Sequence, residues 1–249
     1  MAITIKSNKE IELMREAGKI LSYVHSELET LIKPGISTYE IDKKAYDLII
    51  KHNCIPSFLN YNGFPASVCV SVNEEVVHGI PSKTRILREG DIVSLDAGLI
   101  HKGWHSDAAR TIGVGNISEA ATRLIEVTKQ SFFEGIKLAR AGNHLHDISA
   151  AIQEYVEANG FSVVRDLVGH GIGREMHEEP QIPNFRQPRR GVKLVPGMAL
   201  AIEPMVNTGR YDVVWLEDDW TVATEDESLS AHYENTIVIT DGEPEILSL

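Results

Sequence analysis

The sequence predicts an α+β fold, in which a curved antiparallel sheet carries helices on one face. The prediction rests on a repeat, because two helices followed by strands are expected twice along the chain. Residues 90–96 (GDIVSLD) align with 197–203 (GMALAIE) at an offset of 107 residues, and each copy ends an apolar strand with an acid. We therefore expect a single domain over 1–249, whose similar halves, about 7–117 and 118–249, bring their acids together.

Capping boxes and stop signals predict the helices. Ser7 and Ser37 are each followed three residues later by glutamate, a pattern that satisfies the free N–H groups of a first helical turn. Apolar residues then recur at helical spacing. The expected helices run from Ser7 to before Pro34, from Ser37 to about His52, from Ser118 to about Arg140, and from about Leu145 to Ala158.

Short apolar runs between turn signals predict the strands. They are 68–72, two strands joined by a tight turn within 91–114, 161–164, 198–203, 213–216, 220–223 and 233–240. Residues 73–88, the glycine-rich 169–173 and the Pro- and Arg-bearing 180–196 are expected to be loops.

The hairpin within 91–114 carries two aspartates. If His101 and Lys102 form a two-residue loop, Asp96 falls directly opposite Asp107, on the same face of the sheet. One glycine-induced bulge would change this register. Like charges so placed repel each other, so a cation between them is expected.

Three more residues extend this candidate site. Glu203 ends an apolar strand, where a charge is unfavourable unless it is paired. Glu234 begins the next predicted strand, and His170 lies between glycines that let the backbone pass close to a ligand. With Asp96 and Asp107 they make four carboxylates and one imidazole, a set that balances two divalent cations and suits manganese, iron, cobalt or zinc. Two such ions can share a bridging hydroxide, which is a strong nucleophile at neutral pH.

Composition narrows the class of protein. The net charge of −12 argues against DNA binding, which needs a basic face. Cys54 and Cys69 have no zinc or disulfide spacing, which is typical of a reduced compartment. The N-terminus has no signal-peptide pattern and no apolar run has the length of a membrane span, so we expect a cytoplasmic protein that contacts no membrane.

Several motifs together resemble one family. They are 71–81 (SVNEEVVHGIP), 90–96, 169–173 (GHGIG), 177–180 (HEEP), 201–204 (AIEP) and 234–237 (ENTI). Over nearly its whole length the chain resembles the bacterial type I methionine aminopeptidases, M24 peptidases with the pita-bread fold. The resemblance implies an enzyme that removes the initiator methionine of nascent proteins when the second residue is small, and we expect a monomer by default. It also implies two divalent ions, for which Co, Mn, Fe, Zn and Ni are candidates.

The resemblance implies a role for each ligand. Asp96 would chelate one ion, Asp107 and Glu234 would bridge both, and His170 and Glu203 would hold the second. A bridging hydroxide would attack the carbonyl of the first residue, with Glu203 relaying the proton.

Two histidines would contact the substrate without ligating metal. His177 would hydrogen-bond the peptide carbonyl oxygen and His78 the scissile amide nitrogen. The methionine side chain would enter a slot formed by Phe58, Tyr61, Phe64, Cys69 and Trp220. Phe58 stands where relatives often have cysteine, and Met176 where an aromatic residue is frequent, so the shape of the slot is expected to differ.

Two peripheral features complete the expectations. Asn73 and Ser230 match a Na⁺ or K⁺ site of relatives. A basic cluster in the 180–196 loop, formed by Arg186, Arg189, Arg190 and Lys193, offers a contact for ribosomal RNA, although a solvated loop is the simpler interpretation.

Other members of the fold are weighed as alternatives. Aminopeptidase P and prolidase usually carry a large N-terminal domain, whereas this chain has only a few residues before its first expected helix. Type II methionine aminopeptidases carry a helical insertion for which this chain has no room. A zinc-finger extension is excluded by the length and the cysteine count. A binding module that has lost its metals should have a broken ligand set, whereas all five positions here hold ligand types.

Overall fold

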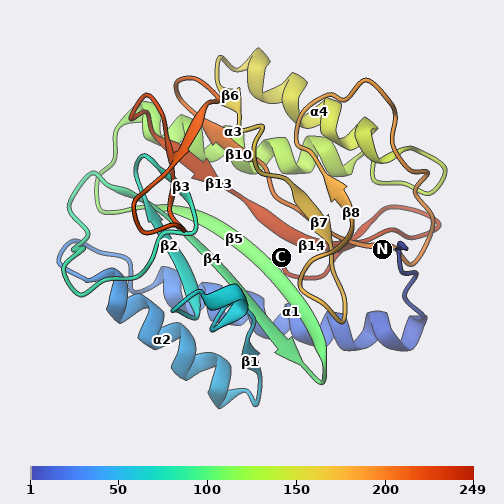
Figure 1. The fold of residues 1–249 in the computed structure, drawn as a ribbon, viewed down its shortest axis with the longest axis horizontal. Helices are drawn as coiled ribbons and strands as arrows, with labels where there is room; N and C mark the ends of the chain where they lie inside the picture. The colour runs from blue at the N-terminus through green and yellow to red at the C-terminus, as the bar shows by residue number, and fades with distance from the viewer. Residues whose placement is uncertain (1) are drawn as a thin grey trace.

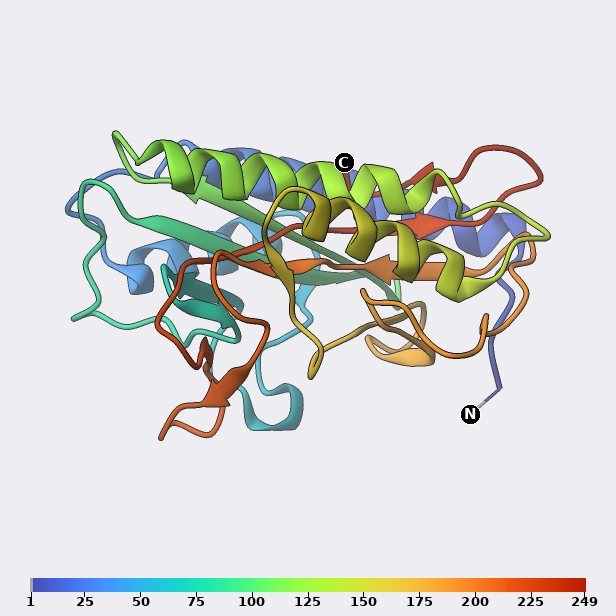
Figure 2. The ribbon, with the colours of Figure 1, turned by 90° about the horizontal axis from the view of Figure 1, so that it is seen from above.

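A nine-stranded antiparallel sheet crosses the molecule, with the helices on one side of it (Figures 1 and 2). The structure is a computed structural model that describes residues 2–249. The main path of the sheet is β1 (Ile55–Pro56), β4 (Ile92–His101), β5 (Trp104–Gly113), β14 (Glu234–Val238), β9 (Ala199–Ile202), β7 (Gly169–Gly171) and β8 (Glu178–Ile182). β2 (Val68–Val72) pairs with β4, and β15 (Glu245–Ile246) pairs with β14. The predicted α+β class and curved antiparallel sheet are confirmed.

Two small sheets and a 3₁₀ turn complete the strands and loops around the main sheet. One small sheet is β13 (Ser230–His232), β10 (Met205–Asn207) and β6 (Ser162–Val163). The other is β11 (Val213–Trp215), β12 (Val222–Thr224) and β3 (Glu75–Val77), and the turn is η1 (Tyr61–Gly63). η1 and the β11–β12 hairpin project from the side of the sheet away from the helices (Figure 2).

Residues 2–249 form four α-helices close to the predicted bounds: α1 (Asn8–Glu29), α2 (Thr38–Lys51), α3 (Glu119–Ile136) and α4 (Leu145–Ala158). Both predicted capping boxes are present, since the backbone N–H of Ser7 donates to Glu10 at 2.8 Å and that of Ser37 to Glu40 at 2.9 Å. No helix of the described residues is both long enough and apolar enough to cross a membrane.

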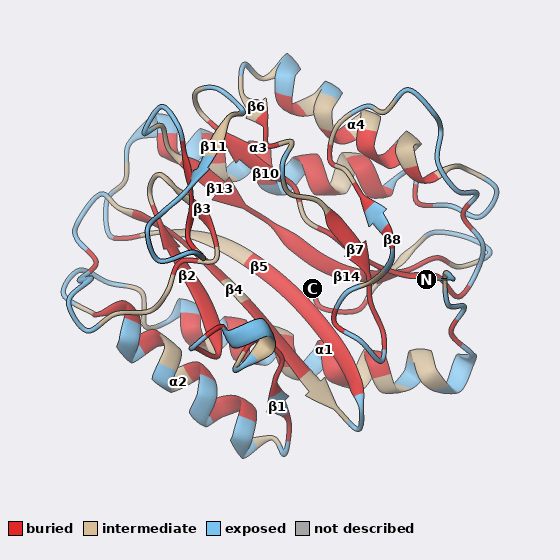
Figure 3. Ribbon diagram, in the orientation of Figure 1, coloured by how far each residue is buried: buried red, intermediate tan, exposed pale blue. Residues whose placement is uncertain are grey.

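Each helix pair buries its own apolar core against the sheet. Side chains of α1 and α2 pack with those of β2, β4 and β5, including Leu21, Val24 and Leu95. Side chains of α3 and α4 pack with those of β9 and β14, including Phe132 and Ile152. Figure 3 shows both pairs buried toward the sheet and exposed outward. The two cores therefore support the sheet from its helix side, behind the residues on its other face.

The register predicted for the long hairpin is wrong by two residues. His101 pairs with Trp104, so the loop is Lys102-Gly103, and Asp96 pairs with Ala109 while Asp107 pairs with Gly98. The loop residues have φ of +50° and +81°, as a type I′ turn requires. Asp96 and Asp107 still share one face of the sheet, but as diagonal neighbours.

Some predicted loops contain strands. Residues 75–77 within the predicted 73–88 loop form β3, and the first part of the 180–196 loop lies in β8. Residues 169–171 form β7. Its two glycines lie very close to neighbouring strands, since a Cβ on Gly169 would lie 2.4 Å from the Ala201 oxygen and one on Gly171 would lie 2.2 Å from the Glu179 oxygen. Glycine there permits close strand approach. The short strands β10, β13 and β15 were not predicted.

Candidate metal centre

One cavity is lined by every residue predicted to ligate metal, to act in catalysis or to bind the substrate. It has a volume of about 380 Å³. The predicted residues that line it are Phe58, Tyr61, Phe64, Cys69, His78, Asp96, Asp107, His170, His177, Glu203, Trp220 and Glu234. They come from both halves of the chain, so only the folded sheet brings them together.

Three of the five ligand candidates form a compact group in this cavity, and Glu203 lies beside it. One ligand atom from each of Asp107, His170 and Glu234 lies within 4.8 Å of the others. The Oε1 atom of Glu203 lies 3.6 Å from Nε2 of His170. Thr236 fixes the strand at Asp107, because its Oγ1 accepts from the Asp107 N–H at 2.9 Å and donates to the Asp107 carbonyl at 3.0 Å.

The acids of this cluster are costly to ionise in the bare protein. Burial, reinforced by the charge of Asp107, raises the pKa of Asp96 well above its usual range. Burial raises the pKa of Asp107 to about 7. Burial and the neighbouring carboxylates raise the pKa of Glu203 and of Glu234 well above normal. The lining supplied by residues 2–249 includes no lysine or arginine that could pair with these acids.

Buried oxygen atoms without partners indicate that the cluster suits a cation. Among the described residues, Asp96 Oδ1 and Glu234 Oε1 are buried and accept no hydrogen bond. Buried acceptors of this kind are normally satisfied by a partner or an ion. Carboxylate oxygens with one imidazole are ligands for divalent metals, so the residues present fit such an ion.

His170 is held in the form that ligates metal. Its Nδ1 lies 2.9 Å from the Gly171 carbonyl oxygen and donates to it, which leaves the Nε2 lone pair facing Glu203. Burial lowers the pKa of His170 to about 3, so the ring is neutral at physiological pH.

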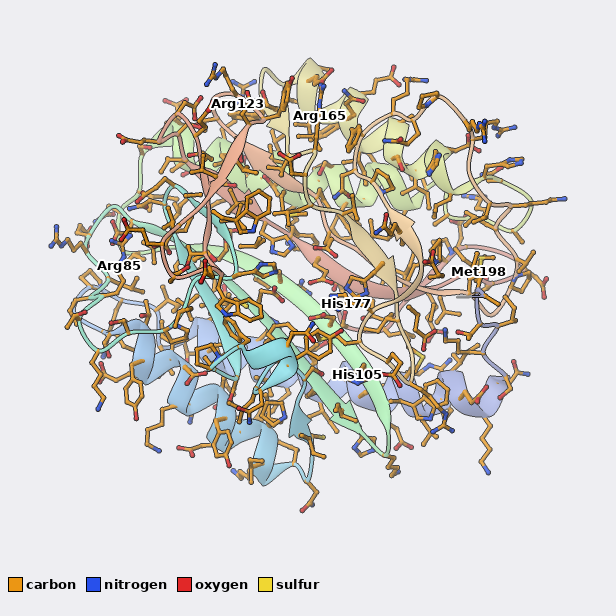
Figure 4. The ribbon with its side chains drawn as sticks, viewed as in Figure 1. Arg85, His105, Arg123, Arg165, His177 and Met198 are labelled. Carbon is orange, nitrogen blue, oxygen red and sulfur yellow. The ribbon has the colours of Figure 1, made fainter. Side chains whose placement is uncertain are left out.

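His177 and His78 stand above the cluster. The Tyr61 hydroxyl lies 2.8 Å from Nδ1 of His177, and the His177 and His170 rings are 4.3 Å apart. Figure 4 shows His177 over the middle of the sheet. His78 has a φ of +60°, an uncommon conformation for a residue with a side chain, and such strain often marks functional sites. Burial lowers the pKa of His78 to about 4.

Apolar side chains form a slot beside the cluster. Phe58, Phe64, Cys69 and Met176 are buried together, with Tyr61 and Trp220 packed against them. The rings of Phe64 and Trp220 meet edge to face at 5.2 Å. Burial, together with the charges of Asp96 and the other acids, raises the pKa of Cys69 well above normal, so it remains an uncharged thiol.

Sequence reasoning missed several residues of the site. His232 is 1% exposed and its Nε2 lies 3.8 Å from Oε2 of Glu203. Burial lowers its pKa to about 3, so it packs against Glu203 as a neutral ring. Leu167, Val168 and Met205 also line the cavity. The sequence carries no signal for them beyond their nearness to His170 and Glu203.

The remaining predicted residues lie outside this cavity. The Asn73 carbonyl accepts from the Ser230 N–H at 2.9 Å, so the two residues of the expected monovalent-cation site are neighbours. In the basic loop, Arg190 pairs with Asp147 at 2.5 Å and Arg186 with Glu154 at 3.9 Å, which offsets part of its positive charge.

A buried acid cluster that fits divalent metal, next to two histidines and an apolar slot, is typical of a metal-dependent hydrolase whose substrate carries an apolar side chain. Comparison with known proteins agrees with this class. The model of metallopeptidase family M24 matches residues 12–241, and the chain belongs to that family.

Relatives of this chain are methionine aminopeptidases. The protein of that name from Clostridium acetobutylicum is 59% identical over 247 residues, which cover 99% of each chain. The crystal structure of methionine aminopeptidase from Thermotoga maritima matches with a TM-score of 0.97 and 46% identity, covering 99% of both chains. The predicted pita-bread fold is therefore confirmed.

A more distant structure shares the fold alone. The Xaa-Pro dipeptidase from Bacillus anthracis matches with a TM-score of 0.79 and 24% identity. This chain covers 61% of that structure, and the match supports no statement about substrate.

Proposed function

We propose that this chain is a metal-dependent aminopeptidase that removes the initiator methionine of nascent proteins when the second residue is small. One observation carries the proposal: the apolar slot and the acid cluster form a single cavity. A methionine side chain in the slot brings its own peptide bond to the acids. A relative that is 59% identical and has this activity in its name supports it.

We propose that the single catalytic domain holds two divalent ions. Asp96 would serve one ion, His170 and Glu203 would serve the other, and Asp107 and Glu234 would be shared by the two. The raised pKa values of the acids support this assignment, because cations remove the cost of ionising them together. When bound, the ions supply a hydroxide nucleophile and polarise the peptide carbonyl. Co, Mn, Fe, Zn and Ni are all compatible with this donor set.

The protein groups have separate tasks. Glu203 takes the proton of the nucleophile and passes it to the leaving amine. His177, oriented by Tyr61, donates from Nε2 to the carbonyl oxygen as negative charge develops on it. His78, neutral at physiological pH because burial lowers its pKa to about 4, contacts the scissile amide nitrogen.

The slot recognises methionine through its aromatic edges. Phe64 and Trp220 form one wall, and Phe58 and Met176 narrow the base. A thioether packs favourably against such ring edges. Phe58 packs against β4 close to Asp107. A Cβ on Gly98 of this strand would lie 3.0 Å from Cε1 of Phe58 and 3.2 Å from Oδ1 of Asp107.

Peptide hydrolysis by the purified protein tests the proposal. Met-Ala-Ser, Pro-Ala-Ser and Ala-Pro-Ser are incubated with the protein, with and without manganese or cobalt, and released amino acids are quantified. Methionine release from Met-Ala-Ser alone, abolished by chelator, supports the function. Cleavage of the proline peptides instead assigns a proline-specific peptidase, and metal-independent binding without turnover assigns a binding module.

Further proposals concern the surroundings of the enzyme. We propose a cytoplasmic monomer that meets its substrates as they leave the ribosome, with Arg189 and Lys193 of the 180–196 loop contacting ribosomal RNA. A Na⁺ or K⁺ ion at Asn73 and Ser230 would stabilise the junction of β2 and β13. Charge reversal at Lys193 in a ribosome co-sedimentation assay tests the contact with ribosomal RNA. Thermal unfolding in NaCl, KCl and choline chloride tests the monovalent-cation site.

A further inference from the structure

A lysine from the N-terminal segment is buried against Glu178, the residue that follows His177 in the sequence. The side chain of Lys6 is 3% exposed, and its Nζ lies 2.6 Å from Oε2 of Glu178, which is itself 11% exposed. The two residues are 172 positions apart in the sequence. A buried lysine is rare unless it is paired, and Glu178 is the partner that permits the burial of Lys6.

Glu178 folds the turn that carries His177. Its Oε1 accepts from the backbone N–H groups of Arg174 at 2.9 Å and Glu175 at 3.3 Å. Its Oε2 accepts from Lys6 and from the Thr4 hydroxyl. Burial opposes ionisation of Glu178, but the hydrogen bonds from Lys6 and Thr4 outweigh it and lower the pKa of the carboxyl. One carboxylate thus ties the start of the turn to the N-terminal segment.

The backbone on both sides of this contact is fixed. Lys6 N–H donates to the Gly197 carbonyl at 2.8 Å, and Ser7 caps α1 immediately afterwards. On the other side, a Cβ on Gly173 would lie 2.6 Å from Cε of Lys6 and 2.5 Å from Oε1 of Glu178. The absence of a side chain at Gly173 therefore makes room for the ion pair.

His177 needs this support because it lies on an irregular turn. Residues 173–177 form bends between β7 and β8, with no helix or strand to hold them. The only side-chain hydrogen bond found for His177 among residues 2–249 is to Tyr61, at 2.8 Å. The position of its Nε2 therefore depends on how the turn is held.

We propose that Lys6 is a positioning residue for His177, acting through Glu178: the buried ammonium group holds the Glu178 carboxylate, which holds the turn that presents the histidine to the substrate carbonyl. The inference rests on the proposed function for its effect on catalysis, but not for its effect on His177 itself.

Substitutions at both ends of the ion pair test the inference. We expect Lys6→Met to lower kcat for Met-Ala-Ser about 10–100-fold with KM changed less than about twofold, because a slightly misplaced catalytic group slows the reaction more than it weakens binding. Glu178→Gln keeps an oxygen for the backbone N–H groups and should lower kcat in the same way. The double variant should be no slower than the worse single variant, because both changes break one link. Lys9→Met, which removes an exposed lysine of α1, is the matched control.

A spectroscopic measurement separates positioning from general damage. Histidine ring signals are recorded by NMR in metal-free protein labelled with ¹⁵N-histidine, and the His177 signal is assigned by its loss in His177→Ala. Lys6→Met and Glu178→Gln should shift or broaden the His177 signal while the buried His25 signal stays in place. Metal content after loading should equal that of the wild type.

The outcomes are distinct. An unchanged His177 signal with wild-type kcat, additive losses in the double variant, or loss of metal from either variant overturns the inference. Should Lys6→Met not fold, Glu178→Gln decides by the same criteria. If the wild-type protein releases no methionine, the proposed function fails, but the NMR comparison still decides whether Lys6 positions His177.

Discussion

Glu178 and the four acids of the candidate metal centre are all largely withdrawn from water, but among residues 2–249 only the Glu178 carboxylate of these five forms an ion pair with a lysine or arginine. Lys6 lies 2.6 Å from Glu178, and hydrogen bonds lower the pKa of that carboxyl despite its burial. At the metal centre, burial and mutual repulsion raise the pKa of Asp96 and of its neighbours. Lys6 thus compensates the charge of Glu178 within the protein, whereas the four acids lack such a partner at the site where we propose that metal binds.

The largest expected effect comes from removing the proposed base. Glu203→Ala should lower kcat about 10³-fold, within the range for loss of a general acid–base, while the protein stays folded. Steady-state release of methionine and a thermal unfolding curve are the measurements. Glu126→Ala, an exposed acid of α3, is the control. Near-normal cleavage by Glu203→Ala would show that another residue moves the proton.

His78 should matter for turnover but not for metal. His78→Ala is expected to lower kcat about 10²-fold, because it removes a contact with the leaving nitrogen. Metal content by mass spectrometry should equal that of the wild type, since the five proposed ligands are untouched. His52→Ala, at the end of α2, serves as control. Loss of both ions in His78→Ala would place this histidine in the metal shell.

The two kinds of carboxylate should give opposite pH dependences of stability. The pKa of Asp107 is raised from its usual 3.8 to about 7, so the folded metal-free protein binds more protons than the unfolded chain. Its contribution to the free energy of unfolding is present below about pH 4 and is lost as the pH rises through 7. Glu178, with a lowered pKa, contributes stability that is present above its usual pKa and is lost on acidification.

Thermal unfolding checks this difference. In metal-free protein Tm should fall between pH 6 and 8, and each kcal/mol lost lowers Tm by about 2–4 °C in a domain of this size. Saturating manganese should remove the fall, because metal binds the ionised acids. A metal-free Tm that stays level or rises over this pH range would contradict the prediction.

The smallest expected effect concerns β7, which carries His170 and pairs with β8 at Glu178. A Cβ in Gly171→Ala would lie 2.2 Å from the Glu179 oxygen, so β7 and β8 must separate at the point where His170 and Glu178 are both anchored. We expect a loss of about 1–3 kcal/mol in the free energy of unfolding. Denaturant unfolding measures it, with Gly242→Ala, whose Cβ would meet nothing closer than 3.9 Å, as control. Equal stability of the two variants would show that the strands adjust freely.

Much of the fold could be predicted because its signals are local. Capping boxes and helical periodicity located the helices within a few residues, and the long hairpin was expected. The register of this hairpin was not predicted. Its turn requires a positive φ at Lys102, which adopts +50°, and the presence of a lysine does not indicate such a conformation. Strands such as β10 and β13, three residues each, are too short to show periodicity.

The candidate site could be predicted in its membership but not in its geometry. Every residue expected in the site lines the cavity, because acids at the ends of apolar strands and histidines between glycines are unusual and therefore recognisable. His232 was missed, since a buried histidine next to Glu203 has no pattern of its own. Their individual roles stay predictions that the variants above address.

The sequence by itself determined the helices, the apolar strands and the residue types available for metal and substrate, because each depends on neighbours in the chain. Only the tertiary structure decided that Asp96 and Asp107 are diagonal neighbours, and that Lys6 meets Glu178 across 172 positions. Strand register and buried ion pairs arise from packing between distant segments, where one residue of slip reverses a side chain and local sequence carries no record of the partner.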